Sequence, residues 1–355
     1  MTQGNLLSFV ESVTDGSRLR VESDLGGGFV RLRVSEAERR QAKQDIRCVE
    51  DAVIELLRNA RDAHARNIFV ASARSGSVRH LVLIDDGDGI PFELWNTVFE
   101  PRVTSKLNTM HFDDWGVHGR GMALYSIREN SLSAEICTSQ PEEGTALECT
   151  FDCNALAERT DQSSLPELCL SDSGLYLGPG PHNIPRAVAE FALANKDVCT
   201  VYYGSPVEIA ATVREFSLGH REALYSPLVS AEVSPFDIVR SVKTAAELKA
   251  AANILGLEFS ERSARRILSH EISAVSPILE TLKRDGKVPS PCEVDLNQDF
   301  RGLKIHPDDM SDFKRDIMRA FEELADRYYL TTDAAPQVRV TKDGIRILIP
   351  TTNKD

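Results

Sequence analysis

The sequence lacks the features that would assign the chain to a membrane or secreted class. It has no uninterrupted apolar run of about 18 residues, the length that a membrane-spanning helix needs. The first residues, MTQGNLLSFVESVTDG, contain neither a basic start nor a long apolar core of the kind found in secretory signals. We therefore expect a cytoplasmic protein that has no membrane partner.

Cysteine is scarce and follows no ligand or disulfide pattern. The seven cysteines of the 355-residue chain include no CxxC pair, and an odd number does not suit a disulfide framework. Cys149 and Cys153 fall on one face of an expected strand, but two thiols without further ligands nearby favour core packing over a metal site. We expect reduced thiols that are mostly buried.

The chain also lacks an excess of basic residues. Its 54 acidic and 41 basic side chains give a formal net charge of −13, whereas nucleic-acid-binding domains usually carry a basic surface. Two helical segments around Gly256, the second with Arg262, Arg265 and Arg266, have the spacing of a helix-turn-helix. The local charge is almost balanced, so nucleic acid is kept only as an alternative partner with little support.

What the sequence does contain is an alternation of strand and helix patterns in its first half. The segment 29–34 alternates apolar and basic residues as a half-exposed strand does, and Ser35 followed by Glu38 forms a capping box. One long helix is expected from there to about His64. Strands are expected at 67–73, 78–84, 133–139 and 145–153.

Two polar residues share one face of this helix. Glu55 and Asn59 stand four residues apart in the stretch ELLRNARDA, with apolar neighbours around them. A carboxamide oxygen is a hard ligand suited to Mg²⁺, and a neighbouring carboxylate can orient and deprotonate an attacking water. The pair fits a site for a nucleoside triphosphate. The simpler alternative is an amphipathic surface helix whose polar face happens to carry both residues.

A carboxylate and two glycines follow the second expected strand. Asp85 stands at the strand end in DDGDGI, where it can accept a hydrogen bond from an exocyclic amine such as adenine N6. Gly87 and Gly89 indicate a sharp turn or the close passage of a planar group. A plain acidic turn is the alternative, and the spacing does not match a calcium loop.

A polar segment at 100–118 is too long for a simple connection, and we expect an irregular loop there. It leads through a glycine-rich stretch into a helix at 122–130. Backbone N–H groups at such a junction favour a phosphate, because they are unsatisfied and lie at the positive end of the helix dipole. The glycines are Gly116, Gly119 and Gly121.

Taken in this order, the motifs resemble the GHKL superfamily, whose members include gyrase-type topoisomerases, the heat-shock chaperone of the ninety-kilodalton class, histidine kinases and MutL-type mismatch-repair proteins. The resemblance covers about residues 29–153 and implies an ATP-binding domain with a Bergerat fold. This is a two-layer α/β sandwich, in which helices cover a mixed, mostly antiparallel sheet. The matching boxes are 55–63, 85–89, 119–121 with Gly116 before it, and 144–145.

The resemblance implies a role for the matched residues. Asn59 stands at the magnesium ligand, Glu55 at the general base of the ATP-hydrolysing branches, and Asp85 at the acid that reads adenine. Thr145 stands where a residue supports this acid through a water. The implied cofactors are ATP and Mg²⁺. The other residues expected at the nucleotide are Asp62, Gly87, Gly89, Ile90, Lys106, Gly116, Gly119, Arg120, Gly121 and Met122.

Two of these assignments have simpler alternatives. Asp62 would equally suit a salt bridge on the helix surface, and Lys106 a solvated position in the loop.

The branch of the superfamily is indicated less directly. VFEPRVTSK, residues 98–106, resembles the histidine-kinase segment before the lid, whereas RGMALYSI resembles a MutL run. A histidine kinase needs a phosphoacceptor histidine upstream of the N box, and the first histidine is His64, within the N-box helix. We therefore expect slow ATP hydrolysis, with a nucleotide-ordered lid that switches a protein partner or an ATP-dependent homodimer. A kinase acting on a partner in trans, or a nucleotide-gated binding module without hydrolysis, remain alternatives.

The length and the 42% hydrophobic content allow two domains. We expect the ATP-binding domain at 1–155, a Ser-, Pro- and Gly-rich linker at 156–185, and a mainly helical α+β region at 186–355. This last region is expected to end in a helix at 307–329 and a β-hairpin at 337–350. The lysine that transducer domains donate to the γ-phosphate cannot be identified in it.

Overall fold

The computed structural model shows two compact units, Met1–Leu168 with Leu175–Val288 and Cys169–Gly174 with Pro289–Asp355. Three predicted site residues, Lys106, Gly119 and Arg120, lie outside the described residues. The structure describes residues 21–104, 111–113, 116–118, 121–159, 161–171, 174–219, 233–284, 307–328, 330–331, 336–341, 344–349 and 352–353.

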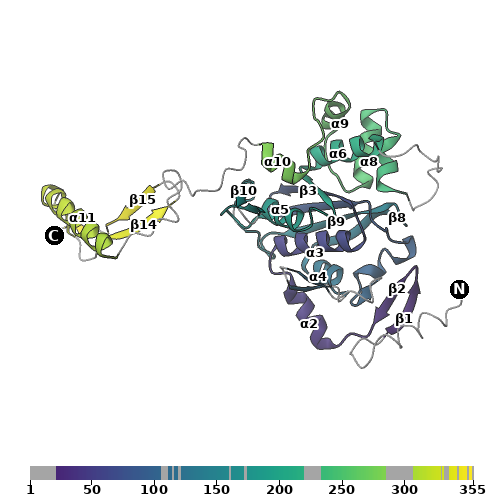
Figure 1. Ribbon diagram of the computed structural model, residues 1–355, viewed down its shortest axis with the longest axis horizontal. Coiled ribbons are helices and arrows are strands. Elements are labelled where there is room, and N and C mark those ends of the chain that lie inside the picture. Colours follow the sequence, from purple (N-terminus) through teal and green to yellow (C-terminus); the bar gives the residue numbers. More distant parts are fainter. Residues whose placement is uncertain are drawn as a thin grey trace. The chain divides into compact units, whose positions relative to one another are not determined.

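A five-stranded sheet forms the middle layer of the first unit (Figure 1), with the strand order β12-β3-β4-β9-β8. Strand β12 runs parallel to β3, and the other neighbours are antiparallel. The expected α/β fold with a mixed, mostly antiparallel sheet is therefore confirmed. The strands are β3 (Asn67–Ser75), β4 (Val78–Asp85), β8 (Ser133–Gln140), β9 (Gly144–Asp152) and β12 (Thr200–Gly204).

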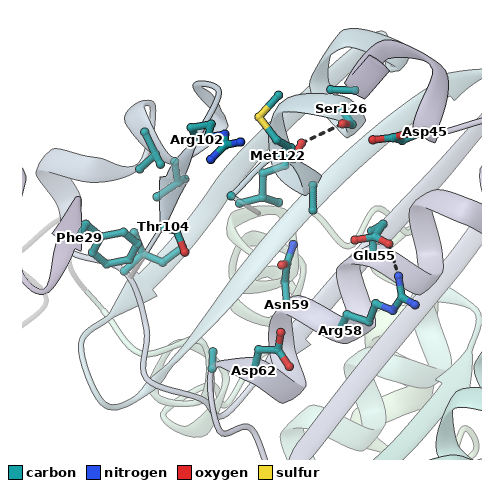
Figure 2. A pocket seen from close by; sticks show the side chains of 18 of the residues that line it. Phe29, Asp45, Glu55, Arg58, Asn59, Asp62, Arg102, Thr104, Met122 and Ser126 are labelled. Atoms are coloured by element: carbon teal, nitrogen blue, oxygen red, sulfur yellow. Dashed lines mark hydrogen bonds and ion pairs between the residues drawn. The ribbon is translucent and has the colours of Figure 1, made fainter. Parts of the chain in front are cut away.

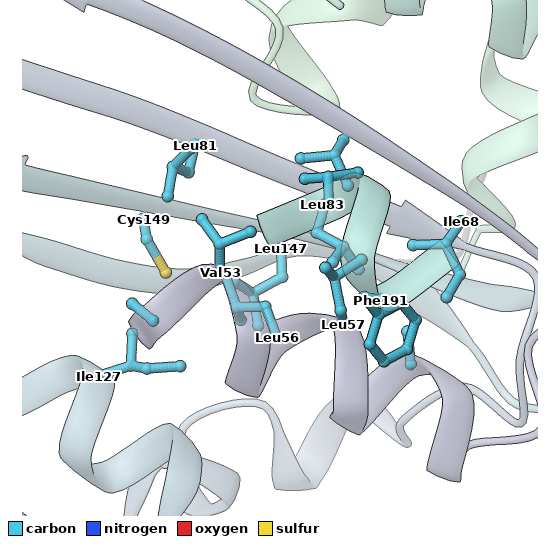
Figure 3. Packing of buried hydrophobic residues seen from close by; sticks show 14 of the residues in the cluster. Val53, Leu56, Leu57, Ile68, Leu81, Leu83, Ile127, Leu147, Cys149 and Phe191 are labelled. Atoms are coloured by element: carbon cyan, nitrogen blue, oxygen red, sulfur yellow. The ribbon is translucent and has the colours of Figure 1, made fainter. Parts of the chain in front are cut away.

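Helices α3 (Val49–Asp62), α4 (Ala123–Asn130) and α5 (Ile184–Ala194) pack against one face of this sheet. Apolar residues recur along α3 at helical spacing, so one stripe of the helix faces the strands while the opposite side stays polar. The resulting apolar core (Figure 3) includes Val53, Leu56, Leu57, Ile68, Leu81, Leu83, Ile127, Leu147, Cys149 and Phe191.

The expected single helix from Ser35 to about residue 64 is wrong, because the chain forms two helices, α2 (Glu36–Asp45) and α3. The predicted capping box that begins α2 is present. At the break, Ile46 has an extended backbone, and the Asp51 carboxylate accepts the Arg47 backbone N–H at 3.0 Å. A side chain here satisfies a backbone donor that a continuous helix would have paired, so α2 ends and α3 begins in a new direction.

A second group of helices covers the other face of the sheet. Phe69 of β3 is fully buried there; its ring stacks on Tyr202 at a centroid distance of 4.8 Å and meets Phe216 edge-on at 5.2 Å. These aromatic contacts join the sheet to the helical layer through one apolar core. The helices are α6 (Pro206–Gly219), α7 (Pro235–Arg240), α8 (Ala245–Ile254) and α9 (Glu261–Leu268).

This arrangement bears on the predicted division of the chain. The predicted linker, 156–185, contains the short strands β10 (Leu168–Ser171) and β11 (Gly174–Leu177), and β12 from the expected second domain completes the sheet of the first. The apolar core is therefore continuous across residues 155 and 186. The second face of the sheet is buried only because α6 to α9 pack against it. A division of roles between 1–155 and 186–355 stays a prediction.

The segment 100–118, expected to be irregular, contains short strands. In it, β5 (Val103–Thr104) pairs with β2 (Phe29–Leu32), and β2 also pairs with β1 (Val21–Gly26). The strands β6 (His111–Asp113) and β7 (Gly116–His118) form a hairpin. Between β4 and β5, the chain forms two single 3₁₀ turns, Phe92–Leu94 and Thr97–Phe99.

The second unit contains a long helix and short strands. Helix α11 (Pro307–Tyr328) and the hairpin of β14 (Gln337–Thr341) with β15 (Gly344–Leu348) match the expected helix and hairpin. The strands β13 (Leu330–Thr331) and β16 (Thr352–Asn353) form a second pair. Helix α10 (Ile278–Arg284) precedes them in the first unit. No described helix combines the length and the apolar character needed to cross a membrane.

The described cysteines are free thiols, as expected. Cys149 lies in the core beneath α3, which confirms the expected core packing of this residue. Burial raises the pKa of Cys137 to about 12 and that of Cys199 to about 11. These thiols are therefore protonated and unreactive at neutral pH.

Candidate nucleotide site

A pocket of about 1100 Å³ lies beside α3, between the amino-terminal end of α4, helix α2 and the turn after β4. Seven residues of the predicted site line it. Figure 2 shows Asn59 pointing from α3 toward the wall that carries Met122 and Arg102. The seven predicted residues are Glu55, Asn59, Asp62, Gly89, Ile90, Gly121 and Met122.

Glu55 and Asn59 face this pocket from successive turns of α3. The Glu55 Oε1 atom accepts a hydrogen bond from Arg58 Nη1 at 2.5 Å, and the Arg58 side chain is only 5% exposed. In contrast, the buried Nδ2 atom of Asn59 has no hydrogen-bond partner. A buried polar group without a partner costs free energy, so this atom needs an explanation that the contacts within the chain do not give.

The strand-end carboxylate lies deeper. Asp85 is 5% exposed, and its Oδ1 atom accepts the Gly87 N–H at 2.9 Å. A Cβ atom on Gly87 would lie 2.4 Å from the Ala63 carbonyl oxygen, and one on Gly89 would lie 2.0 Å from the Gln140 carbonyl oxygen. Both positions therefore need glycine, which explains the two glycines of the motif by close backbone approach.

Thr145 lies next to Asp85 across the sheet. The two residues are register partners in β4 and β9, and Thr145 Oγ1 lies 2.9 Å from Ser139 Oγ. Ser139 Oγ in turn accepts the Ile90 N–H at 2.7 Å. Asp85, Gly87 and Thr145 are not among the lining residues, but this chain of contacts ties Thr145 to Ile90, which lines the pocket. Ser139 was not singled out from the sequence, because nothing local marks a serine on an edge strand.

Gly121 and Met122 form the wall opposite α3. Gly121 has a φ of +67°, and its carbonyl oxygen accepts the Arg102 N–H at 2.7 Å. Met122 is the N-cap of α4 and provides no side-chain cap. The first N–H groups of α4 are thus not satisfied by a capping side chain, and this helix end can hold an anion. Gly116 lies in β7 and does not line the pocket.

Asp62 combines both of its expected environments. It lines the pocket, and its Oδ1 atom accepts hydrogen bonds from Nε and Nη2 of Arg61 at 3.0 and 2.8 Å. The pocket is also lined by three arginines that were not predicted, namely Arg58, Arg102 and Arg47. The spacing of Arg58 three residues after Glu55 is a local signal that could have found the first of them.

The alternative nucleic-acid segment shows a different pattern. In α9, Arg265 pairs with Glu261 at 2.5 Å, and Arg266 pairs with Glu271 at 3.3 Å. Carboxylates thus offset the charge of two of the three arginines, which gives little support to a phosphate-binding face.

Comparison with known proteins agrees with the fold and the pocket. Residues 46–172 match the histidine kinase-, DNA gyrase B- and HSP90-like ATPase family. The fold, the pocket and this match define a GHKL-type ATP-binding domain in the chain.

Among curated proteins, the similarity is to DNA mismatch repair proteins MutL. The MutL of Thermus thermophilus is 44% identical over 84 residues, which cover 23% of this chain and 14% of that protein. The MutL of Thermus aquaticus is 44% identical over 82 residues, covering 23% and 15%. The MutL of Limosilactobacillus reuteri is 39% identical over 101 residues, covering 27% and 14%. The match thus spans about one seventh of the length of these relatives.

Proposed function

We propose that the protein is a slow, magnesium-dependent ATPase whose bound nucleotide orders the segment 100–118 and thereby changes the interaction with a partner. The observation that carries this proposal is the buried Nδ2 atom of Asn59, which has no hydrogen-bond partner and belongs to a residue that lines the pocket one turn from Glu55. A polar ligand in the pocket would account for such an unsatisfied group, which supports this proposal.

The residues present fit a magnesium ion. Asn59 would provide a carboxamide oxygen, and an ion with few protein ligands completes its shell with water and phosphate oxygens. When bound, the ion would neutralise the negative charge that develops on the oxygens of the reacting phosphoryl group. The Asn59 amide nitrogen and oxygen can exchange places by rotation of the carboxamide, so the oxygen can face the ligand.

Other residues of the site would bind the adenine, hold the phosphates and activate the attacking water. Asp85 accepts a hydrogen bond from the exocyclic amine of adenine, while Gly121 and the first N–H groups of α4 hold the phosphates. Glu55, oriented by Arg58, takes a proton from a water as the water oxygen bonds to the γ-phosphorus. The bond from this phosphorus to the bridging oxygen breaks, and ADP and phosphate leave.

The test follows the γ-phosphate. The full chain is incubated with Mg²⁺ and ATP labelled at the γ-phosphorus, and the label is separated into free phosphate, protein and unreacted ATP. Release of free phosphate supports the ATPase. Label on a co-purified protein would instead support the kinase alternative, and bound, unreacted ATP after hours would support a binding module.

The partner belongs to the same proposal. The relatives are named as DNA mismatch repair proteins, but the match covers too little of them to transfer that activity. We propose a protein partner or a nucleotide-dependent homodimer. The elution volume of the chain with and without a non-hydrolysable ATP analogue tests the homodimer, which predicts a doubled mass with the analogue only.

A further inference from the structure

Arg102 stands in an unusual backbone conformation at the edge of the pocket. Its φ is +62°, in the left-handed region that L-residues rarely adopt. Two backbone hydrogen bonds hold it there: its N–H donates to the Gly121 carbonyl at 2.7 Å, and its own carbonyl accepts the Leu32 N–H at 2.9 Å. The conformation places the Arg102 side chain in the wall that Gly121 and Met122 form.

The side chain has an incomplete set of partners. It is 10% exposed, and Nη2 donates to the Glu38 carboxylate of α2. The Nε atom is buried and has no hydrogen-bond partner. A buried guanidinium with an unsatisfied donor is poorly stabilised in this position. The contact with Glu38 therefore leaves one guanidinium donor unsatisfied. An anion that accepts hydrogen bonds from both Nε and an Nη atom would satisfy Arg102 better than Glu38 does.

Glu38 can give up this contact at little cost. Its side chain is 41% exposed, so water can replace the guanidinium at Oε1. Its other oxygen, Oε2, accepts hydrogen bonds from the backbone and the hydroxyl of Ser35 at 2.8 and 2.9 Å. The capping box of α2 thus persists when Arg102 leaves.

We propose that Arg102 binds the terminal phosphates of the nucleotide, exchanging Glu38 for phosphate oxygens as the nucleotide enters. This inference rests on the proposed nucleotide site. A phosphate accepts two parallel N–H bonds from a guanidinium, so it satisfies Nε and one Nη together. Because Nε is shielded where it lies, the exchange includes a rotation of the side chain. Arg102 is then a specificity residue that distinguishes di- and triphosphates from AMP.

The neighbouring arginines of the pocket do not have this combination. Arg58 pairs with Glu55 three residues earlier in its own helix, so its partner cannot move away from it. Arg47 pairs with Asp51, and its side chain is 77% exposed, so water already satisfies its donors. A matched control outside the pocket is Arg40 of α2, which pairs with Glu36 and whose side chain is 78% exposed.

The experiment measures the affinity of the full chain for a non-hydrolysable ATP analogue, ADP and AMP by calorimetry with Mg²⁺. For Arg102→Gln we expect an affinity for the analogue and for ADP that is about tenfold weaker, with the affinity for AMP unchanged. Glu38→Gln removes the competing charge but keeps an oxygen for the capping box, so it should bind the analogue a few-fold more tightly. Arg40→Gln, outside the pocket, should bind all three like the unaltered chain.

Three outcomes would overturn the inference alone: unchanged affinities in Arg102→Gln, an equal loss for all three nucleotides, or no tightening in Glu38→Gln. If Arg102→Gln does not fold, Glu38→Gln decides by itself. Failure of the unaltered chain to bind any of the nucleotides would overturn the proposed function as well, which separates the two.

Discussion

Arg58 Nη1 donates a hydrogen bond to Glu55 Oε1 at 2.5 Å within a single turn of α3. Arg58 is nearly fully buried, whereas the Glu55 side chain keeps 23% of its surface exposed. A buried guanidinium requires an anionic partner, so the pair restrains the carboxylate at the edge of the pocket. This geometry suits a group that must hold a water in one orientation.

Replacing Glu55 tests its chemical role. In Glu55→Gln the side chain keeps its size but cannot accept a proton, so we expect ATP binding to stay intact and hydrolysis to fall by about 10²- to 10⁴-fold. Phosphate release and calorimetric affinity are the measurements. Asp45→Asn, another carboxylate that lines the pocket, serves as the control and should hydrolyse normally. Unchanged turnover in Glu55→Gln would exclude this residue as the base.

The dependence of nucleotide affinity on magnesium should require Asn59. For the unaltered chain we expect ATP affinity to drop when the metal is removed with a chelator, because the carboxamide then has no ion to ligate. In Asn59→Ala the affinity should be low and should not depend on the metal. If Asn59→Ala responds to the chelator as strongly as the unaltered chain, another residue holds the ion.

Asp85 should determine which nucleobase the site prefers. Asp85→Asn weakens a charged hydrogen bond to the adenine amine, so we expect ATP affinity to fall by about tenfold or more and the preference over GTP to shrink. Competition between the two nucleotides measures this preference. Asp88→Asn is the matched control, because Asp88 lies in the same turn but pairs with His64 at the surface. Retained preference in Asp85→Asn would contradict the assignment.

A buried ion pair should make stability depend on pH. Glu158 accepts a hydrogen bond from Arg79 Nη2 at 3.1 Å, and both side chains are under 10% exposed. Burial by itself would raise the pKa of Glu158, but the hydrogen bond and charge of Arg79 lower it below the ordinary value of 4.5. The stabilisation is thus complete above pH 4.5 and is lost as pH falls through the lower, folded-state value.

Arg79→Met should leave Glu158 buried without this partner and destabilise the fold by about 3 kcal/mol at neutral pH. Urea unfolding at a series of pH values measures both effects. In Glu158→Gln the loss of stability below pH 4.5 should be smaller than in the unaltered chain. An identical acid dependence would show that other carboxylates dominate.

The helical layer should be necessary for the ATP-binding domain to fold. A chain that ends at Ala155 would expose Phe69, Val82 and Ile84, which are buried beneath the later helices, and we expect it to aggregate or to bind a hydrophobic dye. A chain that ends at Val288 keeps the whole first unit and should unfold cooperatively. A soluble, nucleotide-binding fragment 1–155 would instead support the domain boundary predicted from the sequence.

Much of the site could be predicted because its signals are local. The spacing of Glu55 and Asn59 places both on one helical face, and Gly87 and Gly89 mark a turn through the close backbone approach that only glycine permits. The break near Ile46 was missed because no proline or glycine marks it. It depends on a side-chain cap from Asp51, which a helical pattern does not show.

The sequence by itself determined where four strands lie along the first half of the chain, the helical segment that carries Glu55 and Asn59, and the likeness to an ATP-binding family. These features are local, because short-range hydrogen bonds and side-chain periodicity leave their pattern within a few residues. Only the tertiary structure decided that β12 completes the sheet beside β3, and that Arg102 meets Glu38 in the pocket wall. Those contacts join segments far apart in the chain, and burial of apolar surface and pairing of charge select them.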